Sequence, residues 1–351
     1  MGKKKVAVLF GGQSTEHEVS CMSAYSVLKN IDTDLYDVSA IGITKTGNWT
    51  VCDDIETVRS DSWKETAEKK CGMTEVLPLL YACDVIFPVL HGICGEDGTV
   101  QGLFELIGKP YVGCGVLASA VCMDKVYTKI VLKDAGIPQC RHLVAERDVI
   151  LKRDGTYERM VSESFGFPCF VKPSNSGSSV GAFKVAEENA LLPALLEAQQ
   201  YDRKILIEEY VNAREIECAV LGNGSAAAVS TPGEIIPSKE FYDYEDKYIS
   251  GTSITQIPAR VPEDVLENIR TLAKKAYNAL DCAGLSRVDF FYDRDTGRVL
   301  LNEINTLPGF TDISMYAKMW AHDGMDFRTL VTRLIELAFE NAARNQRNGV
   351  K

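Results

Sequence analysis

The amino-acid sequence predicts an α/β protein of more than one domain, and three observations support this prediction. The chain has 351 residues, which is enough for two or three domains with large cores. In its first third, apolar strand-like runs end in glycine turns and lead into helical patterns, as in a parallel sheet with helices between its strands. Near its end, residues 284–310 contain two β-prone runs around a turn, which indicates a β-hairpin.

The composition is that of a soluble globular protein, with 46% hydrophobic and 25% charged residues. A formal net charge of −11 argues against nucleic acid or an anionic membrane as the main partner. No apolar stretch approaches the roughly 20 residues that span a bilayer. Residues 1–5 lead straight into a strand, without the apolar region of a signal peptide. We therefore expect a cytoplasmic protein that binds neither nucleic acid nor membrane.

The cysteines predict neither a disulfide framework nor a zinc site. There are 11 of them, an odd number, and none is arranged as Cys-x-x-Cys. Most lie inside apolar runs, as Cys83 and Cys169 do, so we interpret them as reduced core residues.

The first domain is predicted over residues 1–122. Its expected strands are Val6–Phe10, Asp37–Ile43 and Asp84–Leu90. Thr15 and Glu18 have the spacing of a capping box, which predicts that a helix begins there. Because open α/β sheets bind ligands at the carboxyl ends of their strands, the glycine-rich segments Gly11–Ser20 and His91–Gly98 are candidate binding loops.

Each of these loops carries one candidate site residue. Glu16 lies at the mouth of the first turn, where its carboxylate could meet a substrate ammonium, although a Glu there more often interacts with the helix dipole. His91 opens the second loop and is otherwise an ordinary loop residue.

The central part of the chain contains a candidate phosphate loop. A helix is predicted over Ser119–Ala135 and a strand over Phe167–Lys172, which opens into the Ser/Gly-rich segment Pro173–Gly181. The amides of such a segment could surround phosphate oxygens as a nest, with Lys172 at its edge. The segment lacks the Gly-Lys-Ser/Thr ending of a P-loop, and Ser/Gly loops are more often merely flexible.

Two further strands, Lys204–Val211 and Arg214–Leu221, are expected to pair with each other. Glu208 and Glu209 suit an interdomain hinge. Glu215 could accept hydrogen bonds from ribose hydroxyls, or could simply be solvated. The remaining expected elements are a lid over Lys239–Gly251 and helices over Pro262–Leu280 and Phe327–Ala343.

The hairpin of residues 284–310 gathers four polar side chains on one face. With its loop centred on residue 296, Asp289 faces Glu303 across the strand pair. Arg287 then faces Asn305 on the same face, because side chains alternate along a strand. The opposite face is expected to pack on a core through Val288, Phe290, Leu300 and Ile304.

Two carboxylates directly opposite each other repel, so a cation is expected between Asp289 and Glu303. Carboxylate and amide oxygens are ligands of Mg²⁺, which often shares its shell with nucleotide phosphates. Together with Asn305 they form a candidate Mg²⁺–ATP site, and Arg287 lies beside it to stabilise developing negative charge. The alternative is the solvated outer face of an ordinary hairpin.

A series of motifs in a characteristic order connects these loops to one family. The motifs are Gly11–Ser20, Leu90–Gly98, Met123–Lys125, Val171–Gly181, Phe241–Tyr248, Ser286–Asp289 and Asn302–Gly309. Over essentially its whole length the chain resembles the D-alanine–D-alanine ligases of the ATP-grasp superfamily. The resemblance implies an α/β three-domain ATP-grasp fold with an N-terminal parallel sheet, divided at residues 1–122, 123–220 and 221–351, and with ATP between the sheets of the second and third domains.

The resemblance also implies a role for each matching residue. It assigns ATP binding to Lys125, Lys172, Glu208, Glu209, Glu215 and Lys247, with the first two on phosphates, the hinge glutamates at adenine and Glu215 on the ribose. It assigns two Mg²⁺ ions, replaceable by Mn²⁺, to Asp289, Glu303 and Asn305. It assigns an oxyanion hole to Arg287 and the amide of Gly309.

For the amino-acid substrates, the resemblance places Glu16 on the first D-alanine's ammonium and His91 near its carboxylate. Ser178 and Tyr248 would link Glu16 to the closed lid. Tyr248 stands where the similar D-lactate ligases commonly have His. Ser314 is followed by Met315, where D-serine ligases often have Arg. We therefore expect D-alanine at both subsites.

The predicted activity is the ATP-dependent joining of two D-alanines through a D-alanyl phosphate, for peptidoglycan precursors. The alternatives are a D-alanine–D-serine ligase of the glycopeptide-resistance type and a nucleotide-binding regulatory protein without turnover. Because the family commonly forms homodimers through its first domain, a homodimer is expected.

Overall fold

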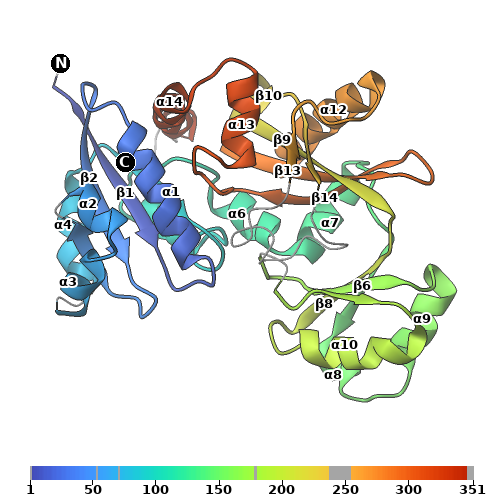
Figure 1. The fold of residues 1–351 in the computed structure, drawn as a ribbon. Helices are drawn as coiled ribbons and strands as arrows, with labels where there is room; N and C mark the ends of the chain where they lie inside the picture. The colour runs from blue at the N-terminus through green and yellow to red at the C-terminus, as the bar shows by residue number, and fades with distance from the viewer. Residues whose placement is uncertain (1, 53, 70–71, 178–179, 237–253, 346–351) are drawn as a thin grey trace.

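The computed structural model describes residues 2–52, 54–69, 72–177, 180–236 and 254–345. Three sheets lie in three lobes (Figure 1), which confirms the predicted α/β architecture. Within the described residues, no helix combines the length and apolarity that crossing a membrane requires. The cysteines in this part of the chain are all free thiols, and all except Cys94 are buried, as expected of core residues.

The first sheet has the strand order β3-β2-β1-β4. Its strands are β1 (Lys4–Gly11), β2 (Tyr36–Ile43), β3 (Trp49–Cys52) and β4 (Val85–Leu90). Strands β2, β1 and β4 are parallel, as predicted. Strand β3 is an antiparallel edge that the sequence analysis missed. The helices of this lobe are α1 (His17–Asn30), α2 (Ile55–Arg59), α3 (Trp63–Lys69), α4 (Met73–Ala82) and α5 (Thr99–Leu106).

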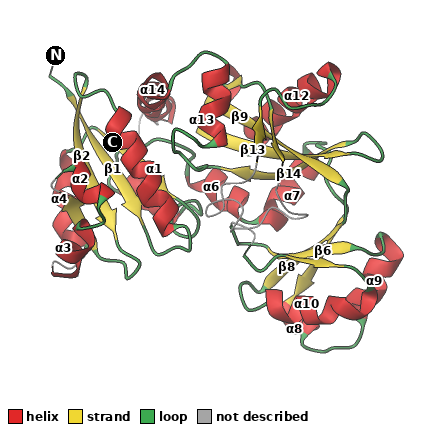
Figure 2. Ribbon diagram, in the orientation of Figure 1, coloured by secondary structure: helices red, strands yellow, loops and turns green. Residues whose placement is uncertain are grey.

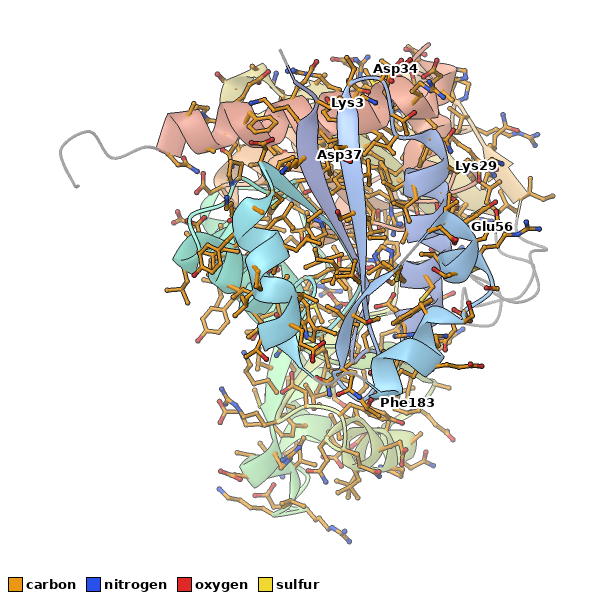
Figure 3. The ribbon with its side chains drawn as sticks, turned by 90° about the vertical axis from the view of Figure 1, so that its left-hand side faces the viewer. Lys3, Lys29, Asp34, Asp37, Glu56 and Phe183 are labelled. Atoms are coloured by element: carbon orange, nitrogen blue, oxygen red, sulfur yellow. The ribbon has the colours of Figure 1, made fainter. Side chains whose placement is uncertain are left out.

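Strand β1 is buried on both faces. Val6, Val8 and Phe10 pack in the core that contains the apolar side of α1. Ala7 and Leu9 pack in the opposite core, with residues of α4 and α5. Figure 3 shows this lobe from the front, with helices on both sides of the sheet. A continuous apolar run is therefore what this strand needs, as in other parallel sheets.

The predicted capping box at Thr15 is wrong. Helix α1 begins at His17, and the Glu18 carboxylate forms an ion pair with Lys45 at 2.7 Å instead of capping the helix. The turn before the helix lies against the end of β2, where the Gly12 amide donates a hydrogen bond to the Ile43 carbonyl. A Cβ on Gly11 would lie 2.2 Å from that carbonyl oxygen, so only glycine fits this close approach.

The predicted helix Ser119–Ala135 is two helices, α6 (Val116–Met123) and α7 (Lys125–Asp134). The break lies at Asp124, whose backbone is extended and whose carboxylate accepts from the amides of Val126 and Tyr127. This is the geometry of an N-cap. As a result Lys125 lies in the first turn of a new helix.

The second sheet is antiparallel and carries its helices on one face. Its strands are β5 (His142–Glu146), β6 (Cys169–Pro173), β7 (Phe183–Val185) and β8 (Lys204–Glu209), in the order β5-β8-β6-β7. Helices α8 (Arg147–Ile150), α9 (Thr156–Ser164) and α10 (Leu191–Ala198) pack on it (Figure 2). Because Val171 and Ile207 point into this helix-covered core, Lys172 and Glu208 point to the other face.

The third sheet has six strands. They are β9 (Ala213–Asn223), β10 (Ala228–Val229), β11 (Gly233–Ile236), β12 (Ile254–Gln256), β13 (Ala283–Asp293) and β14 (Val299–Asn305). The order is β12-β11-β9-β13-β14, with β10 beside β9. Its helices are α12 (Glu263–Ala279), α13 (Met315–His322) and α14 (Phe327–Asn345).

Strand β9 does not pair with β8, which corrects the predicted hairpin. It pairs instead with β13 along eleven residues, from Ala213 to Asn223. The apolar side chains Ile216 and Cys218 pack in the core under α12. The long pairing with β13 and this apolar burial therefore favour β13 over β8 as the partner of β9. Residues 210–212 connect the second sheet to the third, and the predicted hinge residues Glu208 and Glu209 are the last two residues of β8, directly before this connection.

The β13–β14 hairpin has the predicted register at its polar end. Asp289 pairs with Glu303, and Arg287 pairs with Asn305. Beyond Asp289 the register shifts, so that Phe290 pairs with residue 301. Residue 302 is thus the extra residue of a β-bulge.

Because of the bulge, the predicted core face of the hairpin is wrong at one position. Leu301 replaces Leu300 in the core that contains Val288, Phe290 and Ile304. Asn302 lines the same cavity as Glu303, so two consecutive polar side chains of β14 lie on one side of the sheet.

Candidate active site

A cavity of about 440 Å³ lies between the second and third sheets. It is lined by β6 and β8 on one side, by β9, β13 and β14 on the other, and by the connecting residues 210–212. The predicted site residues that line it are Lys125, Lys172, Glu208, Glu209, Glu215, Arg287, Asp289 and Glu303. A site between two sheets is where the resemblance places ATP.

Arg287 and Asn305 hold Asp289 on the cavity wall. Arg287 Nε and Nη2 donate to the two Asp289 oxygens at 2.8 and 2.7 Å, and Asn305 Nδ2 donates at 2.9 Å. Glu217 lies 3.2 Å from Arg287 Nε. Burial opposes the charge of Arg287, but these carboxylates hold its pKa well above the ordinary value. The guanidinium is therefore a permanent positive charge beside the cavity.

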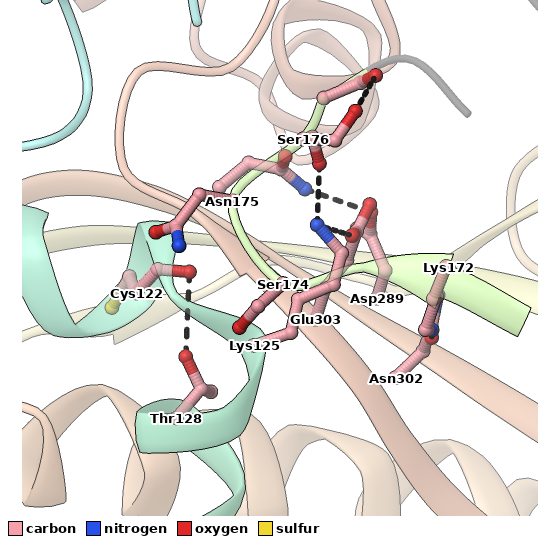
Figure 4. Close-up of polar contacts among 12 residues, drawn as sticks. Cys122, Lys125, Thr128, Lys172, Ser174, Asn175, Ser176, Asp289, Asn302 and Glu303 are labelled. Carbon is pink, nitrogen blue, oxygen red and sulfur yellow. Dashed lines mark hydrogen bonds and ion pairs between the residues drawn. The ribbon is translucent and has the colours of Figure 1, made fainter. Parts of the chain in front are cut away.

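Glu303 lies across the strand pair from Asp289 and close to Lys125. The Lys125 ammonium is 3.6 Å from Glu303 Oε2 and donates to the Ser176 carbonyl at 2.6 Å. Figure 4 shows these groups converging from the α7 terminus, the loop after β6 and the hairpin. Segments far apart in sequence thus meet at one point.

The donors around Asp289 suit a magnesium–nucleotide site better than a dedicated metal cage. Within the described part of the chain, no group of three or more His, Cys, Asp or Glu side chains is placed to hold a metal. Asp289, Glu303 and Asn305 offer two carboxylates and an amide oxygen, all hard donors that fit Mg²⁺. The rest of its shell would come from water and phosphate oxygens, as Mg²⁺ commonly requires.

Asp124 anchors the candidate phosphate loop. Its carboxylate accepts from Ser174 Oγ and from Asn175 Nδ2, and it forms a close ion pair with Lys204. Burial alone would raise the pKa of Asp124, but Lys204 and Ser174 lower it, so the carboxylate is charged. The Lys125 amide donates to the Ser174 carbonyl at 3.1 Å. The helix break and the loop therefore fix each other.

Glu208 lies between two lysines. Lys129 Nζ is 2.6 Å from Glu208 Oε1, and Lys172 forms a close ion pair with Oε2. Burial would raise the pKa of Glu208, but the two lysines lower it to about 2. Lys129 was not among the predicted site residues, although it follows Lys125 by one helical turn and so lies on the same side of α7.

Glu209 and Glu215 are placed differently from Glu208. The Glu209 carboxylate accepts from the Arg141 amide at 2.9 Å and from its Nε at 2.7 Å. Glu215 lies on β9 beside Ile235 and lines the cavity. Their roles at adenine and ribose stay predictions.

Glu16 is buried between the His91–Gly98 loop and the candidate phosphate loop. A Cβ on Gly92 would lie 2.8 Å from Glu16 Oε2, and a Cβ on Gly177 would lie 2.9 Å from it. The structure thus brings Glu16 together with the His91 loop and the phosphate loop. Its contact with a substrate ammonium stays a prediction.

His91 holds the loop that contains Gly309. Its Nδ1 lies 2.9 Å from the Leu307 carbonyl, which can only accept, so Nδ1 carries the proton. Its Nε2 then accepts from Ser23 Oγ at 3.1 Å, and Ser23 Oγ in turn accepts from the Phe310 amide. Burial lowers the pKa of His91, which favours this neutral form.

Glu96 binds the same loop and is another residue that the sequence analysis missed. Its carboxyl oxygens accept from the Gly92 amide at 2.7 Å and from the Leu307 amide at 3.1 Å. Burial, and then the neighbouring charge of Glu16, raise the pKa of Glu96 to about 8. Its position in the glycine-rich segment after β4 could have identified Glu96 as a candidate site residue.

Two predicted substrate residues make contacts within the protein. Ser314 Oγ accepts from the Thr311 amide at 3.0 Å. Met315 is buried, with its Cε 2.7 Å from where a Cβ on Gly233 would lie. Their effect on substrate choice stays a prediction. Ser178, Lys247 and Tyr248, with the whole predicted lid, lie outside the described residues.

Comparison with known families decides which protein family this is. The family model described as "D-ala D-ala ligase N-terminus" matches residues 5–114. The model described as "D-ala D-ala ligase C-terminus" matches residues 131–336. The chain belongs to the D-alanine–D-alanine ligase family. Members of this family are ATP-dependent ligases, and they use ATP, generally with Mg²⁺.

Relatives in the D-alanine–D-alanine ligase family match the chain from end to end. One from Acetivibrio thermocellus is 52% identical and covers 96% of each chain. One from Clostridium acetobutylicum is 51% identical and covers 98% of this chain and 99% of the relative. Both carry the name D-alanine–D-alanine ligase.

Two solved structures have the same fold. The D-alanine–D-alanine ligase from Coxiella burnetii has a TM-score of 0.82 at 36% identity, covering 99% of this chain and 97% of that one. The VanG D-Ala:D-Ser ligase from Enterococcus faecalis has a TM-score of 0.84 at 36% identity, covering 96% and 100%. The predicted ATP-grasp family and its α/β fold are confirmed.

Proposed function

We propose that this protein joins two D-alanine molecules to D-alanyl-D-alanine for peptidoglycan precursors, converting ATP to ADP and phosphate. The observation that carries the proposal is the opposed pair Asp289 and Glu303 on the cavity wall, with Arg287 beside it and Lys125 close to Glu303. Family membership and relatives of about 50% identity with that name support the same activity.

In the first step, a carboxylate oxygen of one D-alanine attacks the γ-phosphorus of ATP, and ADP leaves. The product is D-alanyl phosphate, a mixed anhydride. Lys125 and Lys172 hold the phosphates, and Glu16 holds the ammonium of this D-alanine with His91 near its carboxylate. Positioning and charge neutralisation carry most of such phosphoryl transfer.

In the second step, the amine of the other D-alanine attacks the carbonyl carbon of the anhydride, and inorganic phosphate leaves. One proton departs from the attacking nitrogen. The negative charge that develops on the carbonyl oxygen faces the Arg287 guanidinium and the Gly309 amide. Ser178 and Tyr248 link Glu16 to the lid, whose closure keeps water from hydrolysing the anhydride.

Asp289, Glu303 and Asn305 would hold the metal, which we propose to be two Mg²⁺ ions, with Mn²⁺ able to replace them. When bound, the metal neutralises charge on the phosphate oxygens. Lys247 joins the lysines of the nucleotide site, Glu208 and Glu209 meet the adenine, and Glu215 meets the ribose. We further propose a cytoplasmic homodimer.

One observation favours a second candidate, D-alanine–D-serine ligation. The VanG D-Ala:D-Ser ligase is among the solved structures that superpose well on this chain. Met315, after Ser314, offers no partner for a serine hydroxyl, whereas an apolar pocket rejects an added hydroxyl by only about 10²-fold. D-Alanine is therefore the preferred second substrate and D-serine a weak competitor.

The test is to measure ADP release and product mass with Mg²⁺-ATP and D-alanine alone, then with equimolar D-serine or D-lactate added. One D-alanyl-D-alanine per ADP, dominant in every mixture, is the expected result. A dominant D-alanyl-D-serine product would replace the first candidate with the second. Nucleotide binding with neither ADP nor dipeptide would overturn both.

A further inference from the structure

Lys129 is a buried cation behind the nucleotide cavity. Its side chain is 2% exposed, it lies on α7, and it is absent from the cavity lining. Its Nζ is 2.6 Å from Glu208 Oε1. Among the described residues that line the cavity, Glu208 is the one with which Lys129 forms an ion pair.

The two buried charges depend on each other. Among the described residues, Glu208 is the carboxylate with which Lys129 forms an ion pair. A buried ammonium without a partner is strongly unfavourable, so the Lys129 cation favours the ionised form of Glu208. An ionised carboxylate accepts hydrogen bonds and cannot donate them.

Lys172 is in a different position, although it also contacts Glu208. It lines the cavity, and its Nζ also donates to Asn302 Oδ1 at 3.3 Å, next to Glu303. It is placed to turn toward a nucleotide phosphate. Lys129 is buried and does not line the cavity, so it is the lysine that stays paired with Glu208 when nucleotide is bound.

We propose that Lys129 is a positioning residue that sets nucleobase specificity, because it holds Glu208 as an acceptor-only group that selects a base with an exocyclic amine. This inference rests on the proposed function, in which Glu208 meets the adenine. The 6-amino group of adenine donates to the carboxylate. A base with a 6-oxo group presents a second acceptor to Glu208 and is rejected.

The size of the effect follows from the pairing chemistry. A site built to bind a substrate N–H rejects an analogue that lacks it by on the order of 10⁴-fold, because its buried polar group is left unpaired. Without Lys129, Glu208 loses the charge that keeps it ionised once Lys172 has turned to phosphate. A protonated Glu208 can donate to a 6-oxo oxygen, so discrimination falls.

The experiment compares kcat/KM for ATP and for inosine triphosphate, which differs from ATP in having a 6-oxo group. For Lys129→Met we expect the ATP-to-ITP ratio to fall at least about tenfold from the wild-type value. Lys133→Met, one turn later and exposed on the same helix, is the matched control and should keep the wild-type ratio. An unchanged ratio in folded Lys129→Met would overturn the proposal.

A second variant covers the case in which Lys129→Met does not fold. Lys129→Gln keeps a hydrogen-bond donor for Glu208 and removes only the charge, so the same fall in the ratio is expected. A wild-type ratio in Lys129→Gln would overturn the proposal equally. A merely structural role for Lys129 would lower both rates together and leave the ratio unchanged.

Nucleotide binding separates this inference from the proposed function. Calorimetric dissociation constants for ADP and inosine diphosphate need no turnover, and their ratio should also fall about tenfold in Lys129→Met. If wild-type protein makes no dipeptide but the binding ratio falls, the proposed function fails and the inference stands. If dipeptide forms and neither ratio changes, the inference fails alone.

Discussion

Asp289 shows how the site is built at the scale of single residues. Arg287 grips both of its oxygens and Asn305 donates to one of them, while Glu303 stands opposite. The pairing of these residues could be predicted, because counting outward from the hairpin turn fixes the register. The bulge at Asn302 could not be predicted, because an extra residue in one strand is recognised only from its pairing with the partner strand and not from the alternation of polar and apolar residues.

We expect Glu303→Ala to remain folded and to lose dipeptide synthesis by more than about 10²-fold, since even the outer partners of metal ligands cost 10- to 100-fold. The carboxylate is part-exposed to the cavity, so its removal leaves no large void. Activity assays with circular dichroism check this. Glu267→Ala, in a surface pair with Arg270, is the control. Full activity in Glu303→Ala would remove this residue from the metal site.

Arg287→Lys tests the oxyanion role more narrowly. Lysine keeps the charge but loses the planar fork that spans both Asp289 oxygens. We expect kcat to fall about 10²- to 10³-fold with the KM for ATP nearly unchanged, as when one oxyanion donor is removed. Steady-state kinetics distinguish this from a binding role, in which KM would rise and kcat would hold.

At the scale of elements, the break between α6 and α7 organises the phosphate loop. Asp124 caps α7, and it is also held by Ser174 and Lys204, which come from other elements. The apolar pattern runs on through residue 124, so local sequence predicts one helix. The partners that favour the break are 50 and 80 residues away, beyond any local signal.

Lys204→Met tests whether this network positions the loop. The ammonium pairs with Asp124 and lies 4.5 Å over the Tyr127 ring, so its loss leaves a part-buried carboxylate underpaired. We expect the KM for ATP to rise about tenfold, with kcat changed less, as for the loss of one charged hydrogen bond of about 1.5 kcal/mol. Kinetics and thermal unfolding measure both effects.

The matched control for Lys204→Met is Lys152→Met, an exposed lysine of the same lobe. It should leave both KM and Tm unchanged. A Lys204→Met protein with lower Tm but wild-type KM would show that the network stabilises the fold without positioning the loop.

At the scale of the whole molecule, the first lobe contacts the third through a shared apolar core with α14 and through the backbone of residues 307–310. His91 and Glu96 bind the Leu307 backbone, and Ser23 binds the Phe310 amide. The sequence indicated that the segments around His91 and Gly309 both matter, because each is rich in turn residues after a strand. It could not indicate that they touch, because more than 200 residues separate them and no periodic pattern reports such contacts.

The Glu96 contact predicts a pH dependence of stability. The pKa of Glu96 is about 8 in the folded protein and about 4.5 when unfolded, because burial and Glu16 disfavour its charge. Between these values the folded state binds more protons than the unfolded state. The contribution of Glu96 to the free energy of unfolding therefore falls as the pH rises from 4.5 to 8.

Glu96→Gln removes this titration while keeping the side chain's shape. The Tm of the wild type minus that of Glu96→Gln should therefore fall between pH 5 and pH 8, by roughly 3–5 °C. Burial lowers the pKa of His91 as well, but both proteins contain this histidine, so the difference reports on Glu96. Thermal unfolding at each pH unit checks this. Parallel Tm curves would mean that Glu96 is already ionised at pH 5, and that the grip on Leu307 is a charged hydrogen bond at every pH in this range.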